Sequence, residues 1–338
     1  MKNIFRHIIL IVTIILAQNG IFAQNFVRES LARKVGSNFV SSNSSKTQPT
    51  LNLIHTEIGS NNEANLYIFN IDDSGFVIVS ASKNVRPILA YSFENNFNDD
   101  GLGHAEYFIN NYNRDIEYAK SLNIETDKSI SDLWNDLESN DIKDRAIAVV
   151  DPLIETRWNQ DCFYNEYAPY DNWGPCNRAY AGCVACAMSQ VMKYWNYPEK
   201  GKGSHTYIHH QYGSQSADFG STTYMWDEMP NEIWSHNDAI ATLMYHCGVS
   251  VDMNYGADGS GAQSNKVETA MRMYFGYSSA KYKERDEHSD EEWIAMLKSE
   301  LDESRPMYFS GSGEPGGHAI VCDGYDNNDY FHFNMGWS

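Results

Sequence analysis

One cysteine and one histidine have the setting that covalent catalysis at a carbonyl needs. Cys183 follows Gly182 at the start of an apolar, helix-like stretch, and a helix N-terminus carries a partial positive charge that favours a thiolate. The thiolate is the nucleophilic form of cysteine, and Gly182 has no side chain to block a substrate backbone. His318 follows Gly316 and Gly317 at the start of a strand-like run. These residues predict the nucleophile and the general base of a cysteine hydrolase.

Such a hydrolase needs two further groups. A hydrogen-bond acceptor must orient the imidazole, and the amide of Asn334, just past the next strand-like run, can supply one. The developing oxyanion needs donors, and the loss of one typically costs about 3 kcal/mol. The N–H of Cys183 is free at a helix start, and the amide of Gln160 is the second candidate donor. The sequence therefore predicts one site built from Gln160, Cys183, His318 and Asn334.

The second half of the chain contains the elements that must position these residues. Helical spacing of apolar residues predicts helices, and short apolar runs separated by turns predict an antiparallel sheet after them. Helices are expected at 183–195, at 238–247 with Gly248 as the stop, and at 289–301 with a capping box. Strands are expected at 307–310, 319–322 and 330–333. Helices followed by an antiparallel sheet indicate an α+β fold.

The first half reads as a smaller α+β unit. Its expected elements are strands at 66–71, 76–79 and 85–91 and a helix at 105–122, with a turn at 72–75 between the first two strands. The stretch 129–144 is polar and charged, so it is expected to be a linker open to a protease, with maturation cutting near 140–148. All six cysteines lie beyond residue 160, and this change in composition suggests domains at 24–145 and 146–338.

The length and composition set outer limits. A chain of 338 residues allows one large or two moderate domains, and 42% hydrophobic residues are enough for a packed core. There are 45 acidic and 25 basic residues, giving a net charge of −20. Binding to nucleic acid or to an anionic membrane needs a basic surface, so neither partner is expected.

The first 23 residues have the pattern of an export signal. Lys2 and Arg6 precede an apolar run that is too short to span a membrane, and a cut is expected between Ala23 and Gln24. No second long apolar run follows. We therefore expect export to the periplasm, the cell surface or the medium, with no membrane span after signal removal.

Export affects how the cysteines are interpreted. An even number in an oxidising compartment suggests disulfides, and Cys162 and Cys176 flank a loop that they could close; the sequence leaves this pairing open. Cys183 and Cys186 also form a C-x-x-C motif at a helix start, as in thiol–disulfide oxidoreductases, but the βαβ pattern of that class is absent. A zinc site using these two residues and Cys247 lacks a second paired motif.

The second half resembles the streptopain family of secreted bacterial cysteine proteases, which are papain-like. The matching stretches follow one another in order and cover most of residues 150–338: they are 158–160, 182–185, 192–198, 243–244, 248–253, 305–306, 316–319, 334 and 336–337. The first half resembles the propeptide of that family through 76–81 and 87–92. The resemblance implies a secreted zymogen of a cysteine endopeptidase, whose propeptide inhibits the protease until it is removed.

The resemblance also implies roles for individual residues. Cys183 would be the nucleophile, His318 the general base and acid, Gln160 an oxyanion donor and Asn334 the group that orients the histidine. Trp337 would shield the Asn–His contact from water. The expected cleft walls are the glycine-rich rims 256–261 and 311–317. Gly182, Gly317 and Trp337 are the residues expected to border the substrate. Protein or peptide substrates are implied, and neither a metal nor an organic cofactor is required.

Two departures from the family pattern bear on activity. Met335 stands where the family commonly has an aromatic residue, which is expected to loosen the shield over the histidine. Family members usually continue with further strands of the catalytic sheet after the position of Ser338, and the sequence leaves open whether the natural chain does so. Besides a cysteine endopeptidase and a thiol–disulfide oxidoreductase, the sequence therefore leaves open a third function, that of an inactive, protease-like binding protein.

Overall fold

The computed structural model describes six stretches of the chain: 25–72, 74–97, 106–122, 126–142, 147–312 and 316–337. The chain forms two compact units, one up to residue 146 and one from Ile147 onward. The expected export signal at 1–23 lies outside the described residues. Across the described stretches, no helix is both long and apolar enough to cross a membrane.

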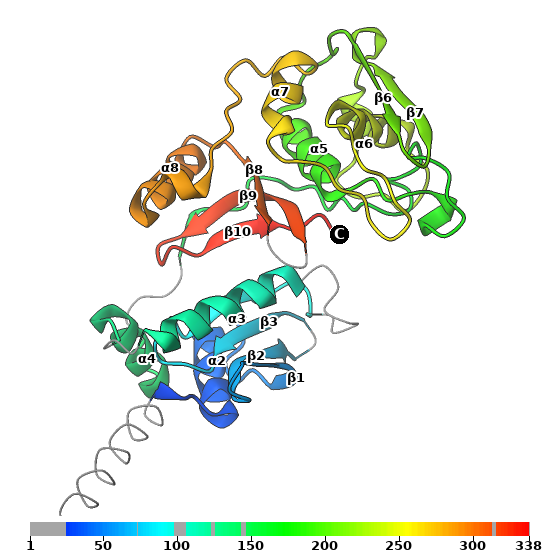
Figure 1. Ribbon diagram of the computed structural model, residues 1–338. Coiled ribbons are helices and arrows are strands. Elements are labelled where there is room, and N and C mark those ends of the chain that lie inside the picture. Colours follow the sequence, from blue (N-terminus) through cyan, green and yellow to red (C-terminus); the bar gives the residue numbers. More distant parts are fainter. Residues whose placement is uncertain are drawn as a thin grey trace, which may run out of the picture. The chain divides into compact units, whose positions relative to one another are not determined.

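The first unit is built on a four-stranded antiparallel sheet in the order β1-β2-β3-β4 (Figure 1). The strands are β1 (Leu51–Ile58), β2 (Ala64–Ile71), β3 (Phe76–Ser80) and β4 (Ile88–Ser92). The expected hairpin between the second and third strands is confirmed, because Leu66 pairs with Ser80 and Asn70 with Phe76. Strand β1 was not foreseen in the sequence.

Two helices pack on opposite faces of this sheet. Helix α3 (Glu106–Ser121) lies where a helix is predicted, and its Ile109 and Ile116 pack with Leu66, Ile68 and Ile78. Helix α2 (Glu29–Asn43) approaches through Gly36, where an added Cβ would touch Leu51, Val77 and Val79. Alternate residues of a strand point to opposite faces, so Val77 faces α2 and Ile78 faces α3. The core of the first unit therefore lies on both faces of the sheet.

The linker predicted at 129–144 is wrong over most of its length. Helix α4 (Lys128–Ser139) occupies it, beginning with a cap in which the side chain of Asp127 accepts the N–H of Ser129. Trp134 is buried and its Nε1 donates to the carbonyl of Val85, while Leu137 is also buried. A helix needs only a narrow apolar stripe to pack on a neighbour. Here that stripe is Trp134 and Leu137, and the charged residues around them made the segment resemble a linker.

The second unit places its helices ahead of most of its sheet in the chain, as expected, but one short strand, β5 (Ala148–Val150), precedes them. Helix α5 (Cys183–Trp195) has the predicted bounds and ends at Asn196 in the left-handed conformation. Helix α6 (Asp238–Ser250) packs on it and runs past Gly248, so the predicted stop is wrong. An added Cβ at Gly248 would lie 2.3 Å from the hydroxyl of Tyr255. The glycine is therefore required by close packing rather than by a helix end.

Two further helices and a hairpin complete the helical part of this unit. Helix α8 (Asp290–Asp302) begins with the predicted capping box of Ser289 and Glu292. The other elements were not foreseen: helix α7 (Lys266–Met273) and the antiparallel hairpin of β6 (Ser204–His209) and β7 (Gly213–Asp218).

The sheet of the second unit is centred on β9 (Gly317–Asp326) (Figure 1). Antiparallel partners flank it: β8 (Met307–Ser312), β10 (Phe331–Asn334) and the short β5 (Ala148–Val150). Helix α5 packs against β9 and β8. The start of α5 lies beside the start of β9, because the N–H of Ala319 acts on the thiol of Cys183, and these two ends carry Cys183 and His318.

Candidate active site

Cys183 is the first residue of α5, and its position depends on the glycine before it. Gly182 has φ +92°, a conformation that other residues rarely adopt. An added Cβ would lie 2.7 Å from Cε of Met253 and 3.1 Å from the carbonyl oxygen of Ser260. The backbone conformation and these neighbours therefore require glycine here. The substrate-access role predicted for Gly182 remains a prediction.

The sulfur of Cys183 lies in a half-buried setting with several backbone donors. Burial raises the pKa of the thiol above its ordinary value, while the N–H groups of Ala319, Val184 and Cys183 itself act in the opposite direction. The donor from Ala319 belongs to β9, and it is the residue next to His318. The helix start and the strand start therefore converge on one sulfur. A thiolate at this sulfur would accept these N–H bonds.

His318 is 7% exposed and lies between a backbone carbonyl and an aromatic ring. Its Nε2 is 2.9 Å from the carbonyl oxygen of Met335, and its ring centroid is 4.5 Å from that of Trp337. A carbonyl can only accept, so this contact assigns the Nε2 proton in the neutral imidazole and leaves Nδ1 as the ring's acceptor. The ring of Trp337 thus lies against the imidazole. Its predicted role, to shield an Asn–His contact from water, stays a prediction.

The structure gives Asn334 different partners from the expected one. Its Nδ2 donates to the carbonyl of Thr156 at 2.8 Å, and its Oδ1 accepts from Nε2 of Gln190 at 3.1 Å and from the N–H of Gly336 at 3.0 Å. An amide oxygen has two acceptor positions, and both are taken. The acceptor at Nε2 of His318 is the main chain of the next residue, Met335. The identity of Met335 therefore matters less for this contact than its backbone position.

Gln160 is buried beside the start of α5. Its carbonyl accepts the N–H of Ala181, two residues before Cys183, at 2.8 Å. Its side-chain Nε2 donates to the carbonyl of Gly336 at 3.3 Å. An amide nitrogen carries two hydrogens, so this bond leaves one available. The main chain of Gln160 is thus bonded two residues ahead of Cys183, and the role of its side chain as an oxyanion donor remains a prediction.

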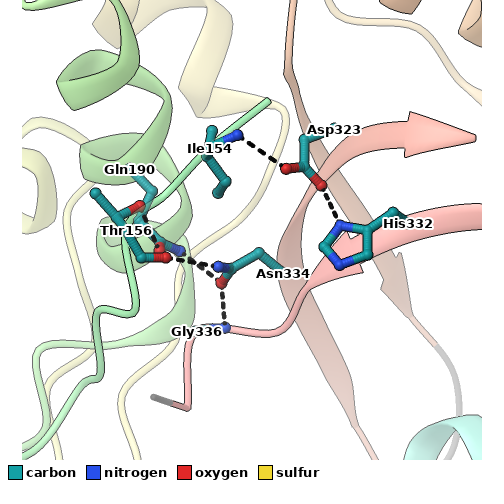
Figure 2. A network of polar contacts seen from close by, with 7 residues as sticks. All are labelled: Ile154, Thr156, Gln190, Asp323, His332, Asn334 and Gly336. Carbon is teal, nitrogen blue, oxygen red and sulfur yellow. Dashed lines mark hydrogen bonds and ion pairs between the residues drawn. The ribbon is translucent and has the colours of Figure 1, made fainter. Parts of the chain in front are cut away.

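A buried polar network beneath these residues was not found from the sequence. Figure 2 shows Gln190 and Thr156 facing Asn334, with the hydroxyl of Thr156 donating to Oε1 of Gln190 at 2.9 Å. In the same view Asp323, which is fully buried, accepts the N–H of Ile154 at 3.0 Å and contacts Nδ1 of His332 at 2.6 Å. One available signal was a glutamine inside the apolar helix that begins with Cys183.

The cysteines of this unit have separate settings. Cys162 and Cys176 form a disulfide, which confirms the pairing that the sequence left open. Cys186, Cys247 and Cys322 are free and buried, and burial raises the pKa of each thiol. Within the described stretches, no group of three or more His, Cys, Asp or Glu side chains is arranged to hold a metal ion.

The two rims predicted as cleft walls are described only in part. The first is tied to the chain before Gly182, because Tyr180 donates its N–H to Gly256 and accepts a bond from the hydroxyl of Ser260. In the second rim, exposed Gly317 pairs with Ser312 across the β8–β9 hairpin. Residues 313–315 lie outside the described stretches. The substrate role of Gly317 stays a prediction.

Comparison with known families decides the family of the chain. Residues 158–338 match the peptidase C10 family, and residues 24–116 match the Spi protease inhibitor family.

The chain belongs to the peptidase C10 family.

Relatives of this C10 chain include two curated proteases. Streptopain of Streptococcus pyogenes is 30% identical over 342 aligned residues, which cover 93% of this chain and 80% of streptopain. The thiol protease/hemagglutinin PrtT of Porphyromonas gingivalis is 31% identical over 334 residues, covering 92% of this chain and 37% of PrtT. The resemblance to the streptopain family is thereby confirmed.

Solved structures of Prevotella intermedia proteins are similar to this C10 chain. A prointerpain A fragment has a TM-score of 0.66 and 29% identity, covering 86% of this chain and 88% of the fragment. Active interpain A cysteine protease has a TM-score of 0.52 and 38% identity, covering 56% of this chain and 82% of interpain A. The expected α+β architecture, a papain-like protease domain preceded by a propeptide, is confirmed. The protein is a cysteine-type peptidase, made with an inhibitor-type domain ahead of the protease domain.

Proposed function

We propose that the chain is the exported zymogen of a cysteine endopeptidase that cleaves protein or peptide substrates with Cys183 and His318. The observation that carries this proposal is the convergence of two elements on one sulfur. Cys183 begins α5, and the N–H of Ala319, the residue beside His318, acts on its thiol from β9. A cysteine nucleophile needs an imidazole within reach to take its proton.

The proposed reaction is acyl transfer. Nδ1 of His318 takes the proton from the Cys183 thiol, and the thiolate attacks the scissile carbonyl carbon. The tetrahedral intermediate collapses as the imidazolium gives its proton to the leaving amine, which leaves an acyl-enzyme. Water, deprotonated by the same imidazole, then attacks the thioester and releases the acid together with the free thiol.

The pKa of the cysteine gives a reason for this proton transfer. Burial raises the pKa of the Cys183 thiol, so the thiol does not ionise readily by releasing its proton to water. A protonated imidazole at His318 would stabilise the thiolate as an ion pair in the same half-buried setting. The main-chain carbonyl of Met335 at Nε2 supports the charged imidazole, because a hydrogen-bond acceptor stabilises it.

Two donors are proposed for the oxyanion. The N–H of Cys183 lies in the first turn of α5, where N–H groups have no intrahelical partner, and the remaining hydrogen of the Gln160 amide is the second. Loss of one such donor typically costs about 3 kcal/mol of transition-state stabilisation. The hydrogen bond between Gln160 and Ala181 supports this role, because it holds the glutamine close to the nucleophile.

The remaining parts of the proposal concern the rest of the chain. Residues 24–145 would act as an intramolecular inhibitor, supported by the match to the Spi protease inhibitor family. Residues 1–23 would direct export, supported by the basic start, the apolar run and the small residue at the proposed cut. Export also agrees with the Cys162–Cys176 disulfide, because such bonds persist in oxidising compartments.

A matched pair of cysteine variants tests the catalytic proposal. Cys183→Ala should reduce hydrolysis of fluorescein-labelled casein by at least about a thousandfold, because it removes the nucleophile. Cys186→Ala should stay within about threefold of the wild type, since Cys186 is fully buried one turn along the same helix. Circular dichroism would check that both variants fold. Retained cleavage by the folded Cys183→Ala variant would refute the proposal.

The same pair separates the peptidase from a thiol–disulfide oxidoreductase. An oxidoreductase needs Cys186 as its resolving thiol, but here that thiol is buried and its pKa is strongly raised by burial. A peptidase should lose little with Cys186→Ala. Loss of insulin-disulfide reduction in Cys186→Ala, with unchanged casein cleavage in Cys183→Ala, would favour the redox enzyme instead.

A further inference from the structure

Three separate segments of the second unit meet at the side chain of Gln190. Helix α5 provides the glutamine itself, seven residues after Cys183. The segment before Gln160 provides Thr156, and the end of β10 provides Asn334. Figure 2 shows these three side chains pointing toward one another. Each segment also carries a residue of the proposed site, namely Cys183, Gln160 or Asn334. The amide of Gln190 therefore joins the three segments that hold the site.

The hydrogen bonds of this meeting point form a closed ring of three. Oε1 of Gln190 accepts the hydroxyl of Thr156 at 2.9 Å, and Nε2 donates to Oδ1 of Asn334 at 3.1 Å. Asn334 in turn donates to the main-chain carbonyl of Thr156 at 2.8 Å. Gln190 is 0% exposed and Thr156 is 4% exposed. In such a setting a lost partner leaves a buried polar group unsatisfied, so the arrangement strongly resists displacement.

The network ends on the main chain that contacts the imidazole. Oδ1 of Asn334 accepts the N–H of Gly336, and Gln160 donates to the carbonyl of Gly336. Met335 lies between these two anchored residues, and its carbonyl oxygen is the group 2.9 Å from Nε2 of His318. The direction of that carbonyl is therefore determined by bonds on both sides of it.

Gly336 allows this segment to pass directly under the helix. It has φ +69°, and an added Cβ would lie 3.0 Å from Sγ of Cys186 and 3.9 Å from Nε2 of Gln190. Both neighbours lie on the same face of α5. The close approach sets the segment at hydrogen-bonding distance from the helix that begins with the nucleophile.

A second anchor joins the same network to β9. Fully buried Asp323 accepts the N–H of Ile154 through its carboxylate and the N–H of Leu153 through its carbonyl. Asp323 lies on the strand that begins beside His318. Thr156 is thus fixed relative to the strand of the histidine as well as to the helix of the cysteine.

We infer that Gln190 and Thr156 are positioning residues for the reaction: through Asn334 they hold the Met335 carbonyl against Nε2 of His318 and so keep the imidazole aligned with Cys183. This inference rests on the proposed function of Cys183 and His318. Neither residue touches the reacting atoms. Their effect is exerted through the orientation and charge of the imidazole, which separates them from residues that only stabilise the fold.

Four variants of the full chain, tested after its maturation, probe this inference. Gln190→Glu keeps the size but places an oxygen against Oδ1 of Asn334, and Thr156→Val keeps the shape but removes the hydroxyl. Thr156→Ser restores the hydroxyl. Ser189→Ala is the matched control, because it removes a buried hydroxyl of the same helix that takes no part in the network.

The expected kinetic result is a loss of kcat with little change in KM. Gln190→Glu should lower kcat for labelled casein about tenfold or more, and Thr156→Val about threefold to tenfold, which are the effects expected when one or two hydrogen bonds are lost. Thr156→Ser and Ser189→Ala should remain within about twofold of the wild type. KM should change less than about twofold in all four variants, because substrate contacts are untouched.

A second readout does not depend on peptide hydrolysis. The rate at which iodoacetamide alkylates Cys183 depends on the ion pair with His318. The pH at which this rate changes on the alkaline side reports the pKa of the imidazolium. Without the Met335 carbonyl the imidazolium is less stable, so this pH should move down by about half a unit or more in Thr156→Val, which removes a hydrogen bond without adding a charge. A residue that only stabilised the fold would not shift it.

The outcomes separate the inference from the function on which it rests. If the wild type cleaves no casein, the proposed function fails, and the alkylation profiles still decide the inference. If Gln190→Glu does not fold, the Thr156→Val and Thr156→Ser pair decides it. Folded variants with an unshifted alkylation profile and wild-type kcat overturn the inference. An equal loss in Thr156→Ser and Thr156→Val would also overturn it, because the hydroxyl would then be irrelevant.

Discussion

Two contacts between a helix and a sheet, one in each unit of the chain, are made by different kinds of side chain. In the first unit, α3 packs on its sheet through aliphatic side chains, including Ile109, Ile116 and Ile68. In the second unit, α5 meets the end of β10 through the amides of Gln190 and Asn334. Aliphatic contact is non-directional, whereas a hydrogen bond weakens steeply when its angle changes. The first interface holds two layers together, and the second also fixes the direction of particular groups.

This difference suggests which kind of change each unit tolerates. An interface held by apolar burial loses stability when volume is removed, but it does not depend on a precise orientation. An interface held by buried amides loses alignment when one atom type is exchanged, even at constant volume. Removal of volume at the α3 contact should therefore affect stability, and exchange of an atom at the α5–β10 contact should affect catalytic rate.

The largest expected effect is on the stability of the first unit. Trp134→Ala should lower its free energy of unfolding by about 3 to 5 kcal/mol, because the indole is fully buried and its Nε1 donates to Val85. Differential scanning calorimetry of the full chain in a Cys183→Ala background would measure it. The transition of the second unit should stay in place. Trp134→Phe, which keeps much of the volume, should cost clearly less, and equal losses would contradict the packing argument.

A smaller effect is expected from the disulfide of the second unit. The Cys162–Cys176 bond closes a loop with a sequence separation of 14. Its removal by a paired Cys162→Ser and Cys176→Ser change should lower the unfolding free energy of that unit by about 3 kcal/mol, because the unfolded chain gains freedom. The transition of the first unit, which contains none of the six cysteines, serves as the internal control. A shift in both transitions would mean that the units unfold together.

The smallest predicted effect is a pH dependence confined to the second unit. Burial lowers the pKa of His246 from 6.5 to about 4. The unfolded chain therefore binds a proton that the folded unit does not, so stability is full above pH 6.5 and is lost progressively as the pH falls toward 4. Between pH 7 and pH 5 the loss should be about 2 kcal/mol.

Replacement of this histidine sharpens the test. In the folded unit Nδ1 of His246 contacts the hydroxyl of Tyr224 at 3.0 Å. His246→Gln cannot titrate in this range, so thermal unfolding of the variant should depend less steeply on pH than that of the parent chain. An unchanged slope would show that other groups cause the acid sensitivity.

The sequence predicted the regular elements around the nucleophile better than the contacts that align them. The bounds of α5 follow from its apolar spacing and from the Asn-Tyr-Pro end, and the capping box of α8 is a local signal. The acceptor at His318 could not be found in this way, because it is a backbone carbonyl and any residue at position 335 provides one. The role of Asn334 stays a prediction, and its partners in the structure depend on where Thr156 and Gln190 meet in space.

Helix α4 shows a different limit of sequence reasoning. Only Trp134 and Leu137 of its side chains are buried, and the polar residues around them suggested a linker. Whether two apolar residues form a docking stripe depends on a receiving surface, here the chain near Val85 and helix α2. Composition alone does not reveal that surface.

The short strand β5 has a consequence for how the chain can be shortened. Ala148 and Val150 pair with Asp326 and Tyr325 of β9, and Ile147 exchanges two further hydrogen bonds with Asn327. A chain severed ahead of Ile147 would keep this border of the central strand intact. A chain severed beyond Val150 would leave backbone groups of β9 bare, which is the kind of edge that promotes aggregation. The pairing of this three-residue strand thus sets the last position at which the preceding residues can be removed while β9 of the second unit keeps its hydrogen bonds.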